Sequence, residues 1–320
     1  MIKVGRASCP PILKTGGSPQ SEGELETIDA IDFFSNPANH GEKYQKMGKS
    51  GKRTKQSFSV YSDKSVRKAL QKMHHGKCAY CESKITDIYS GDIEHFRPKA
   101  GYINDNEPLN KPGYYWLAAE WENLLLACPF CNQTNTHEIS ENGNIQEIVQ
   151  GKLNHFPLDH GGYRLNSTDG SNYFNDNDTY DQAFKREEAA RLLLKPCTDV
   201  NIDKYFKYDD SGVILANDEL ADIELRKAST SIRVYALQRL GLVQNREAKI
   251  IEIKAQIRRV EEALLNYNKS LDKSEEEIVW FEGILRREMQ ILADFKKPSQ
   301  EYAGLARYII DKYFHDSFDI

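Results

Sequence analysis

The 320-residue sequence predicts an α+β protein in which a small core, stapled by metal-binding cysteines, is embedded in a mostly α-helical chain. Two Cys-x-x-Cys pairs flank residues 82–127, and between them Asp92–Phe96 alternates polar and apolar residues as a half-buried strand does. The C-terminal half is helical in pattern. Its clearest apolar stripe follows a helical spacing and consists of Ile250, Ile253, Ile257, Val260 and Leu264.

Residues 1–70 are predicted to be a basic N-terminal arm that ends in a short helix. Residues 1–60 are rich in Gly, Ser, Pro and Lys, whereas Ser62–Met73 has a helical pattern with Ser62 or Asp63 as N-cap. Between residues 43 and 77 there are eleven basic residues and one acidic residue. Such a block favours phosphate binding. It supplies three candidate nucleic-acid contacts, Lys52, Arg53 and Lys55.

Residues 71–165 form the predicted motif-dense domain. The first cysteine pair is typical of a knuckle turn, and Pro98 ends the strand that follows it. The polar stretch Asn104–Gly113 predicts a loop. After the second pair, we expect a helix over Asn132–His137.

Residues 166–320 are predicted to form a mainly helical domain that docks a partner or regulates the core. Asn166–Asp178 is rich in Asn, Asp, Gly and Ser, which predicts a linker. A helix is expected over Phe184–Leu194 and a small hairpin over Tyr205–Ile214. Glu275–Phe295 is expected to fold back on the helix that carries the apolar stripe.

Composition and cysteine usage set the class of protein. The net charge is −5 and the mean hydropathy is −0.65. The sequence contains no apolar run of about 18 residues, so no membrane span is expected. The first residues lack the apolar segment of a secretory signal. Thiols at this spacing without an export signal favour the cytoplasm and metal binding.

The four paired cysteines can supply every ligand of one tetrahedral zinc ion, and a site filled in this way is structural. They are Cys78 and Cys81 in the first pair and Cys128 and Cys131 in the second. An iron–sulfur cluster is the alternative, although the Cys-Pro-Phe-Cys spacing favours zinc. Any chemistry must then belong to the polar residues between and just after the pairs.

His95 is the candidate general base, because a neutral imidazole accepts a proton near pH 7. Glu94 offers a hard oxygen ligand for Mg²⁺ or Mn²⁺, and Asn132 offers a neutral one. Neighbouring side chains of a regular strand point to opposite faces. Glu94 and His95 can therefore share one site only if the strand ends or bends beside them. Arg97 and Lys99, just beyond the base, are candidates to hold the scissile phosphate.

These motifs resemble the HNH endonuclease family, whose fold is called ββα-metal. The matching segments are Asp92-Ile-Glu-His95, Trp121-Glu-Asn-Leu124 and Cys128-Pro-Phe-Cys-Asn132. The resemblance implies that Glu94 and Asn132 bind the catalytic metal, that His95 is the base and that Asn123 orients it. Glu94 departs from the commoner Asp or His of the family but keeps a carboxylate. His137 is a further candidate ligand, next to the position where a third one is common.

Over residues 71–137 the chain is most similar to the HNH proteins of bacterial Septu and retron-linked anti-phage systems. This resemblance implies a DNA nuclease subunit that works beside an ABC- or SMC-like ATPase, and in retron systems beside a reverse transcriptase and its RNA–DNA product. Two alternatives stay open. One is a catalytically silent zinc-stapled DNA-binding or adaptor module, and the other is an RNA nuclease.

Overall fold

The computed structural model describes most of the chain in atomic detail. The described residues are 1–13, 16, 19–105, 107–141, 144–160, 162–165 and 179–318. The linker predicted over Asn166–Asp178 lies outside them. No helix of this part of the chain is long and apolar enough to cross a membrane.

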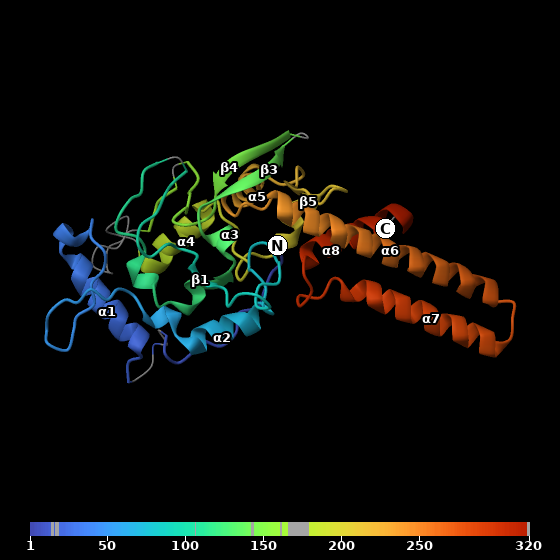
Figure 1. The fold of residues 1–320 in the computed structure, drawn as a ribbon, viewed down its shortest axis with the longest axis horizontal. Coiled ribbons are helices and arrows are strands. Elements are labelled where there is room, and N and C mark those ends of the chain that lie inside the picture. Colours follow the sequence, from blue (N-terminus) through green and yellow to red (C-terminus); the bar gives the residue numbers. More distant parts are fainter. Residues whose placement is uncertain are drawn as a thin grey trace.

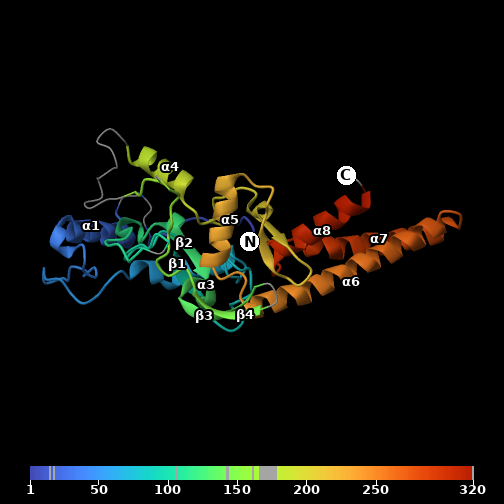
Figure 2. The same ribbon diagram turned by 90° about the horizontal axis from the view of Figure 1, so that it is seen from above.

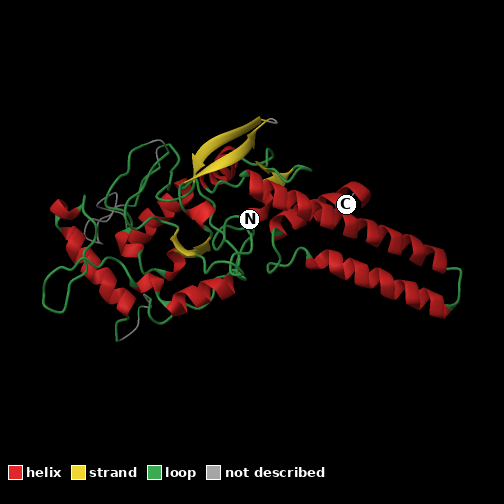
Figure 3. Cartoon of the chain, viewed as in Figure 1, coloured by secondary structure: helices red, strands yellow, loops and turns green. Residues whose placement is uncertain are grey.

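The α+β class is confirmed. A mixed body holds the strands, and a long helical hairpin projects from it (Figures 1 and 2). In the described part of the chain the strands form antiparallel pairs and the rest is helix and loop (Figure 3). The pairs are β1 (Asp92–His95) with β2 (Leu124–Ala127), β3 (Asn135–Glu141) with β4 (Asn144–Gln150), and β5 (Phe206–Tyr208) with β6 (Ile214–Ala216).

The N-terminal region is more ordered than an arm. Helix α1 (Glu22–Ser35) begins with a capping box, in which Glu24 N donates to Ser21 Oγ at 3.2 Å and Ser21 N donates to Glu24 Oε2 at 2.7 Å. Its Phe33 and Phe34 are buried in the core. Residues 1–60 are predicted to be part of an arm, and α1 is an ordered piece of it that packs on the core.

The short helix that precedes the first cysteine pair is confirmed. Helix α2 spans Lys64–Met73, and Asp63 caps it by accepting a hydrogen bond from Ser65 N at 2.7 Å. Val66, Leu70 and Met73 form its buried face. This spacing of four and three residues is the reason that the helix packs on the body.

The strand predicted over Asp92–Phe96 is confirmed as β1, but the helix predicted over Asn132–His137 is wrong. Helix α3 spans only Pro129–Asn132, after which the chain turns into β3. In β3, the buried His137 and Ile139 flank the exposed Glu138, which is the alternation of a strand, and Asn142-Gly143 is a hairpin-turn signal in the sequence. Strand pairing therefore prevails over continuation of the short helix.

The C-terminal part is helical with one small hairpin, as expected. Helix α4 (Tyr180–Ala190) starts earlier than predicted and ends before Arg191, which bridges to Leu158 in an extended conformation. The hairpin over 205–214 is confirmed as β5–β6. The remaining helices are α5 (Asp222–Val234), α6 (Leu240–Ser270), α7 (Glu275–Asp294) and α8 (Ala303–Phe318). Helix α7 folds back on α6 as predicted, and the two lie side by side in both views (Figures 1 and 2).

The segment that leads into α8 packs on the turn of the first cysteine pair. Lys77 Nζ donates to the Gln300 carbonyl at 2.6 Å, and Lys84 N donates to Glu301 Oε1 at 2.6 Å. The Tyr302 hydroxyl lies 3.1 Å from Ser83 Oγ. The segment before α8 therefore supports the cysteine region, and at the other end of the chain the Met1 amino group pairs with Glu82 at 2.7 Å.

Candidate functional site

The four cysteines form one buried cluster. Their sulfur atoms all lie within 4.8 Å of one another. Sulfurs bound at about 2.3 Å to one tetrahedral zinc lie about 3.8 Å apart, so this cluster is the right size for a single ion. The turns are made by backbone hydrogen bonds. Cys78 N donates to the Ser83 carbonyl at 2.9 Å, and Cys131 N donates to the Cys128 carbonyl at 3.2 Å.

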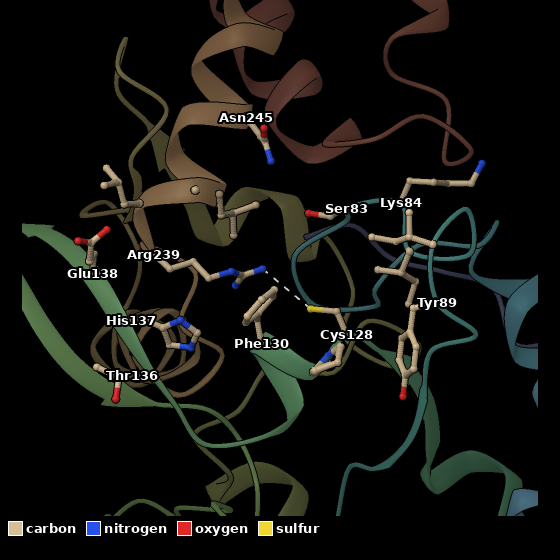
Figure 4. A pocket seen from close by; sticks show the side chains of 16 residues that line it. Ser83, Lys84, Tyr89, Cys128, Phe130, Thr136, His137, Glu138, Arg239 and Asn245 are labelled. Atoms are coloured by element: carbon tan, nitrogen blue, oxygen red, sulfur yellow. Dashed lines mark hydrogen bonds between the residues drawn. The ribbon is translucent and has the colours of Figure 1, made fainter.

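A cation lies against these sulfurs. Arg239, the N-cap residue of α6, points its guanidinium at the second pair, with Nη1 3.4 Å from Cys131 Sγ and Nη2 3.9 Å from Cys128 Sγ. Figure 4 shows Arg239 reaching over Phe130 toward Cys128. A guanidinium at this position stabilises thiolates, which are the form that binds metal. The donor set therefore fits a structural metal ion such as zinc.

His137 lies on β3 and not on a helix that continues from Asn132. It projects from β3 toward the Phe130 ring, with a centroid separation of 6.0 Å. Figure 4 places it in a cavity of about 620 Å³ lined by β3, the cysteine turns and the start of α6. This cavity does not include Glu94 or Asn132. His137 is therefore corrected from a possible ligand beside Glu94 to a residue of a separate cavity, because β3 replaces the expected helix.

A polar cavity of about 380 Å³ opens at the end of β1 and brings together most of the predicted site. Strand β1 ends at His95, so Glu94 and His95 both line this cavity although they are neighbours. Asn132 closes it from the end of α3. The full lining is Tyr61, Ser62, Arg67, Asp92, Ile93, Glu94, His95, Lys99, Asn132, Gln133 and Leu153.

His95 is held in one orientation. Its Nε2 lies 3.0 Å from the Ala118 carbonyl, which can only accept, so Nε2 carries the hydrogen and Nδ1 is left with a lone pair. Lys99 Nζ lies 3.2 Å from that Nδ1. The Tyr61 ring packs edge-on against the imidazole at 4.5 Å. Burial, followed by the nearby Lys99 charge, holds the pKa of His95 well below its usual range, so the imidazole is neutral.

Glu94 is paired with a buried lysine. Lys152 Nζ lies 2.5 Å from Glu94 Oε1 and donates to the His95 carbonyl at 3.0 Å. The Lys152 side chain is fully buried. Burial raises the pKa of Glu94, and the Lys152 charge opposes that rise. Lys152 was missed in the sequence, because it lies in a polar loop far along the chain with no motif around it.

Asp92 is a second carboxylate that the sequence motif did not single out. Its Oδ2 accepts from Asn132 Nδ2 at 2.9 Å and from Gln133 Nε2 at 3.0 Å. Its Oδ1 accepts from the Tyr89 hydroxyl at 2.5 Å. The period of two along a strand could have indicated Asp92, because it stands on the same side of β1 as Glu94. The Asp92 contact leaves Asn132 Oδ1 available as an acceptor.

Asn123 does not line the cavity, and it holds the backbone of the segment after His95 in place by hydrogen bonds. Its Oδ1 accepts from Arg97 N at 2.8 Å, and its Nδ2 donates to the carbonyls of Arg97 and Leu117 at 3.0 and 3.2 Å. It is buried. These bonds hold together the segment after His95 and the segment that provides the Ala118 carbonyl.

The structure corrects the phosphate contact expected for Arg97. Its side chain is 2% exposed, and Nε and Nη2 donate to Glu187 at 2.7 Å and to Glu188 at 2.6 Å. Burial opposes the charged form, but the two carboxylates raise the pKa of Arg97 overall. Both carboxylates that pair with Arg97 lie on α4, so Arg97 links α4 to the segment that follows His95. Its buried guanidinium is therefore not available to a phosphate in solvent. Lys99, by contrast, lines the cavity, and its pKa is lowered to about 8 by burial.

The basic residues of the N-terminal region also divide into residues that pair with carboxylates of the protein and residues that are exposed or line the cavity. Arg53 pairs with Asp29 at 2.5 Å and with Asp32 at 2.7 Å, so it fastens its loop to α1. This pairing argues against the phosphate contact expected for Arg53. Lys52 and Lys55 are exposed. Arg67, from the same basic block, lines the polar cavity.

No protein-family model matches the chain. It is 33% identical over 260 residues to the Septu protein PtuB of Bacillus mycoides (strain KBAB4), which covers 79% of this chain and 69% of the relative. It is 30% identical over 102 residues to the Septu protein PtuB of Bacillus thuringiensis, which covers 31% of this chain and 35% of that relative. The chain therefore belongs to the Septu PtuB family.

Proposed function

We propose that this chain is a metal-dependent DNA endonuclease subunit of the HNH type, the nuclease effector of a Septu anti-phage system that acts with an ABC- or SMC-like ATPase. The observation that carries the proposal is the polar cavity in which Glu94, His95 and Asn132 meet. The order strand, strand, helix of β1, β2 and α3 around it agrees with a ββα-metal core. Membership of the Septu PtuB family supports the defence role.

Glu94 and Asn132 are the residues that would hold a catalytic Mg²⁺ or Mn²⁺ ion, with Asp92 beside them. Lys152 pairs with Glu94 at Oε1, and Asn132 donates to Asp92 through Nδ2, so Oε2 of Glu94 and Oδ1 of Asn132 are the oxygens that would act as ligands. When bound, the ion supplies positive charge to the scissile phosphate and to the leaving oxygen. Arg67, whose guanidinium donates to the Gly91 carbonyl, lines the same cavity and adds a positive charge for the DNA backbone.

His95 is proposed as the general base through Nδ1. The Ala118 carbonyl fixes the tautomer, so that the lone pair of Nδ1 is the one that can take a proton from water. Lys99 now faces Nδ1 at 3.2 Å. An incoming phosphate would attract the Lys99 ammonium and leave Nδ1 facing the water. Asn123 acts at a distance, by holding the backbone that positions His95.

The cysteine cluster is proposed to hold structural zinc. It joins the turn of residues 78–81 to the start of α3, which carries Asn132. With four thiolate ligands the ion has no open position, so it has no part in the reaction. The predicted helical region 166–320 is proposed to dock the ATPase. A reverse transcriptase with its RNA–DNA product remains a prediction from the resemblance to retron systems.

Cleavage assays on different nucleic acids test this proposal against its alternatives. The purified chain, alone and with its Septu ATPase, is incubated with supercoiled plasmid or with RNA in Mg²⁺ or Mn²⁺. We expect nicked or linear plasmid that requires the added metal. Cleavage of RNA with intact plasmid would support an RNA nuclease. Binding of DNA without cleavage under every condition would support a silent DNA-binding module.

A further inference from the structure

Helix α7 has two apolar faces, and among the described residues only one of these faces is packed against other elements. Leu285 and Leu292 point into the core, and between them Gln256 Nε2 of α6 donates to the Glu288 carbonyl at 3.0 Å. On the opposite side, Val279 is 60% exposed and Trp280 is 68% exposed. An apolar face of this kind on a projecting helix marks an interaction surface.

The outer face contains a hollow. It has a volume of about 510 Å³ and is lined by Glu276, Val279, Trp280, Gly283, Ile284 and Arg287. A Cβ added to Gly283 would meet nothing within 4 Å, so the floor of the hollow is bare backbone. Glycine at such a point allows a second helix to approach closely. The residues 276, 280, 283 and 287 follow steps of four, three and four, which define one stripe along α7.

We propose that this face binds the same face of a second copy of the chain, with the two α7 helices antiparallel. The stripe is complementary to itself only in that orientation. Trp280 of one copy meets Gly283 of the other, and Glu276 meets Arg287. The midpoints of both pairs fall between Phe281 and Glu282, so one two-fold axis satisfies them together.

Charge and shape select a second copy as the occupant. Glu276 stands near the start of the stripe and Arg287 near its end, so antiparallel pairing joins opposite charges whereas parallel pairing joins like charges. The Arg287 guanidinium pairs with Glu288 of its own helix at 2.9 Å, but its side chain is 67% exposed and is therefore accessible to a second chain. The bulk of Trp280 fills the hollow that Gly283 leaves. The proposal concerns assembly alone and does not depend on nuclease activity.

Sedimentation velocity of the full-length chain over a concentration series tests this interface. We expect the wild-type protein to pass from monomer to a species of twice the mass. Trp280→Ala should raise the dissociation constant about 30-fold or more, as loss of a buried aromatic anchor does. Met289→Ala, an exposed apolar residue of α7 outside the stripe, should leave the dissociation constant unchanged.

Charge reversal makes the test specific for the register. Glu276→Arg and Arg287→Glu should each weaken the dimer, because each places like charges together. The double variant should restore it. A chain that stays monomeric at all concentrations would overturn the proposal, and so would a dimer that none of these changes weakens. If the monomeric chain instead loses its ATPase on Trp280→Ala, the face belongs to that partner and self-association is refuted.

Discussion

Replacing Lys152 by methionine should strongly destabilise the protein. Lys152 Nζ lies 2.5 Å from Glu94 Oε1, and the two side chains are 0% and 8% exposed. Methionine fills much of the same volume but leaves a buried carboxylate without its partner. Removal of one member of such a pair costs about 3–5 kcal/mol of unfolding free energy. Urea denaturation without added divalent metal measures this change.

The double variant Glu94→Gln/Lys152→Met separates the ion pair from the packing. Because it removes both charges, it should be more stable than Lys152→Met alone, and the cycle should give a coupling of about 2 kcal/mol. Lys207→Met is the control, since its partners Asp218 and Glu219 are exposed. It should leave the denaturation midpoint nearly unchanged.

The pH dependence of Lys152→Met provides a second check. Burial already raises the pKa of Glu94, and loss of the Lys152 charge should raise it further. A folded-state pKa above the unfolded value means that the folded protein binds more protons, so stability falls as pH rises through that interval. The deficit should therefore be largest near neutral pH and smaller in mild acid. A deficit below about 1 kcal/mol at neutral pH would refute the assignment of a buried ion pair.

Three further results are expected. Arg97→Met should lower the unfolding free energy by about 3–5 kcal/mol, because Glu187 stays buried and loses the cation that pairs with its charge. A loss of DNA affinity without loss of stability would contradict this. Cys131→Ser should abolish zinc binding and lower the melting temperature. Elemental analysis measures the bound zinc per chain, and an unchanged zinc content would contradict a single four-cysteine site. Lys99→Ala should weaken DNA binding and reduce its salt dependence by about one counterion, while the melting temperature is retained. Unchanged DNA binding at all salt concentrations would contradict a contact between Lys99 and a phosphate.

The local parts of the fold could be predicted because their signals lie in short segments. The Asp63 cap and the steps of Val66, Leu70 and Met73 define α2, and alternation defines β1. Where two signals competed, the prediction failed. The sequence after Cys131 predicts a helix, but pairing of β3 with β4 decides its structure.

The candidate site was predictable where its residues share a motif and not where tertiary contacts supply them. Glu94, His95 and Asn132 were placed near one another by their spacing around the cysteines, and they line one cavity. Lys152 reaches the site through tertiary contacts. Its backbone N donates to the Cys131 carbonyl at 3.0 Å, and this bond holds its loop where Lys152 Nζ contacts Glu94. Arg97 failed as a candidate for a similar reason, since its carboxylate partners lie on α4, far along the chain.

The plasmid cleavage rate of His95→Ala tests the central claim most directly. Wild type and variant are compared with the Septu ATPase present and Mg²⁺ or Mn²⁺ added, and zinc content and melting temperature are measured on the same preparations. Loss of a general base lowers a rate by about 100-fold or more, so we expect cleavage to fall by at least that factor while zinc and fold are retained. Cleavage by His95→Ala at the wild-type rate would contradict the account.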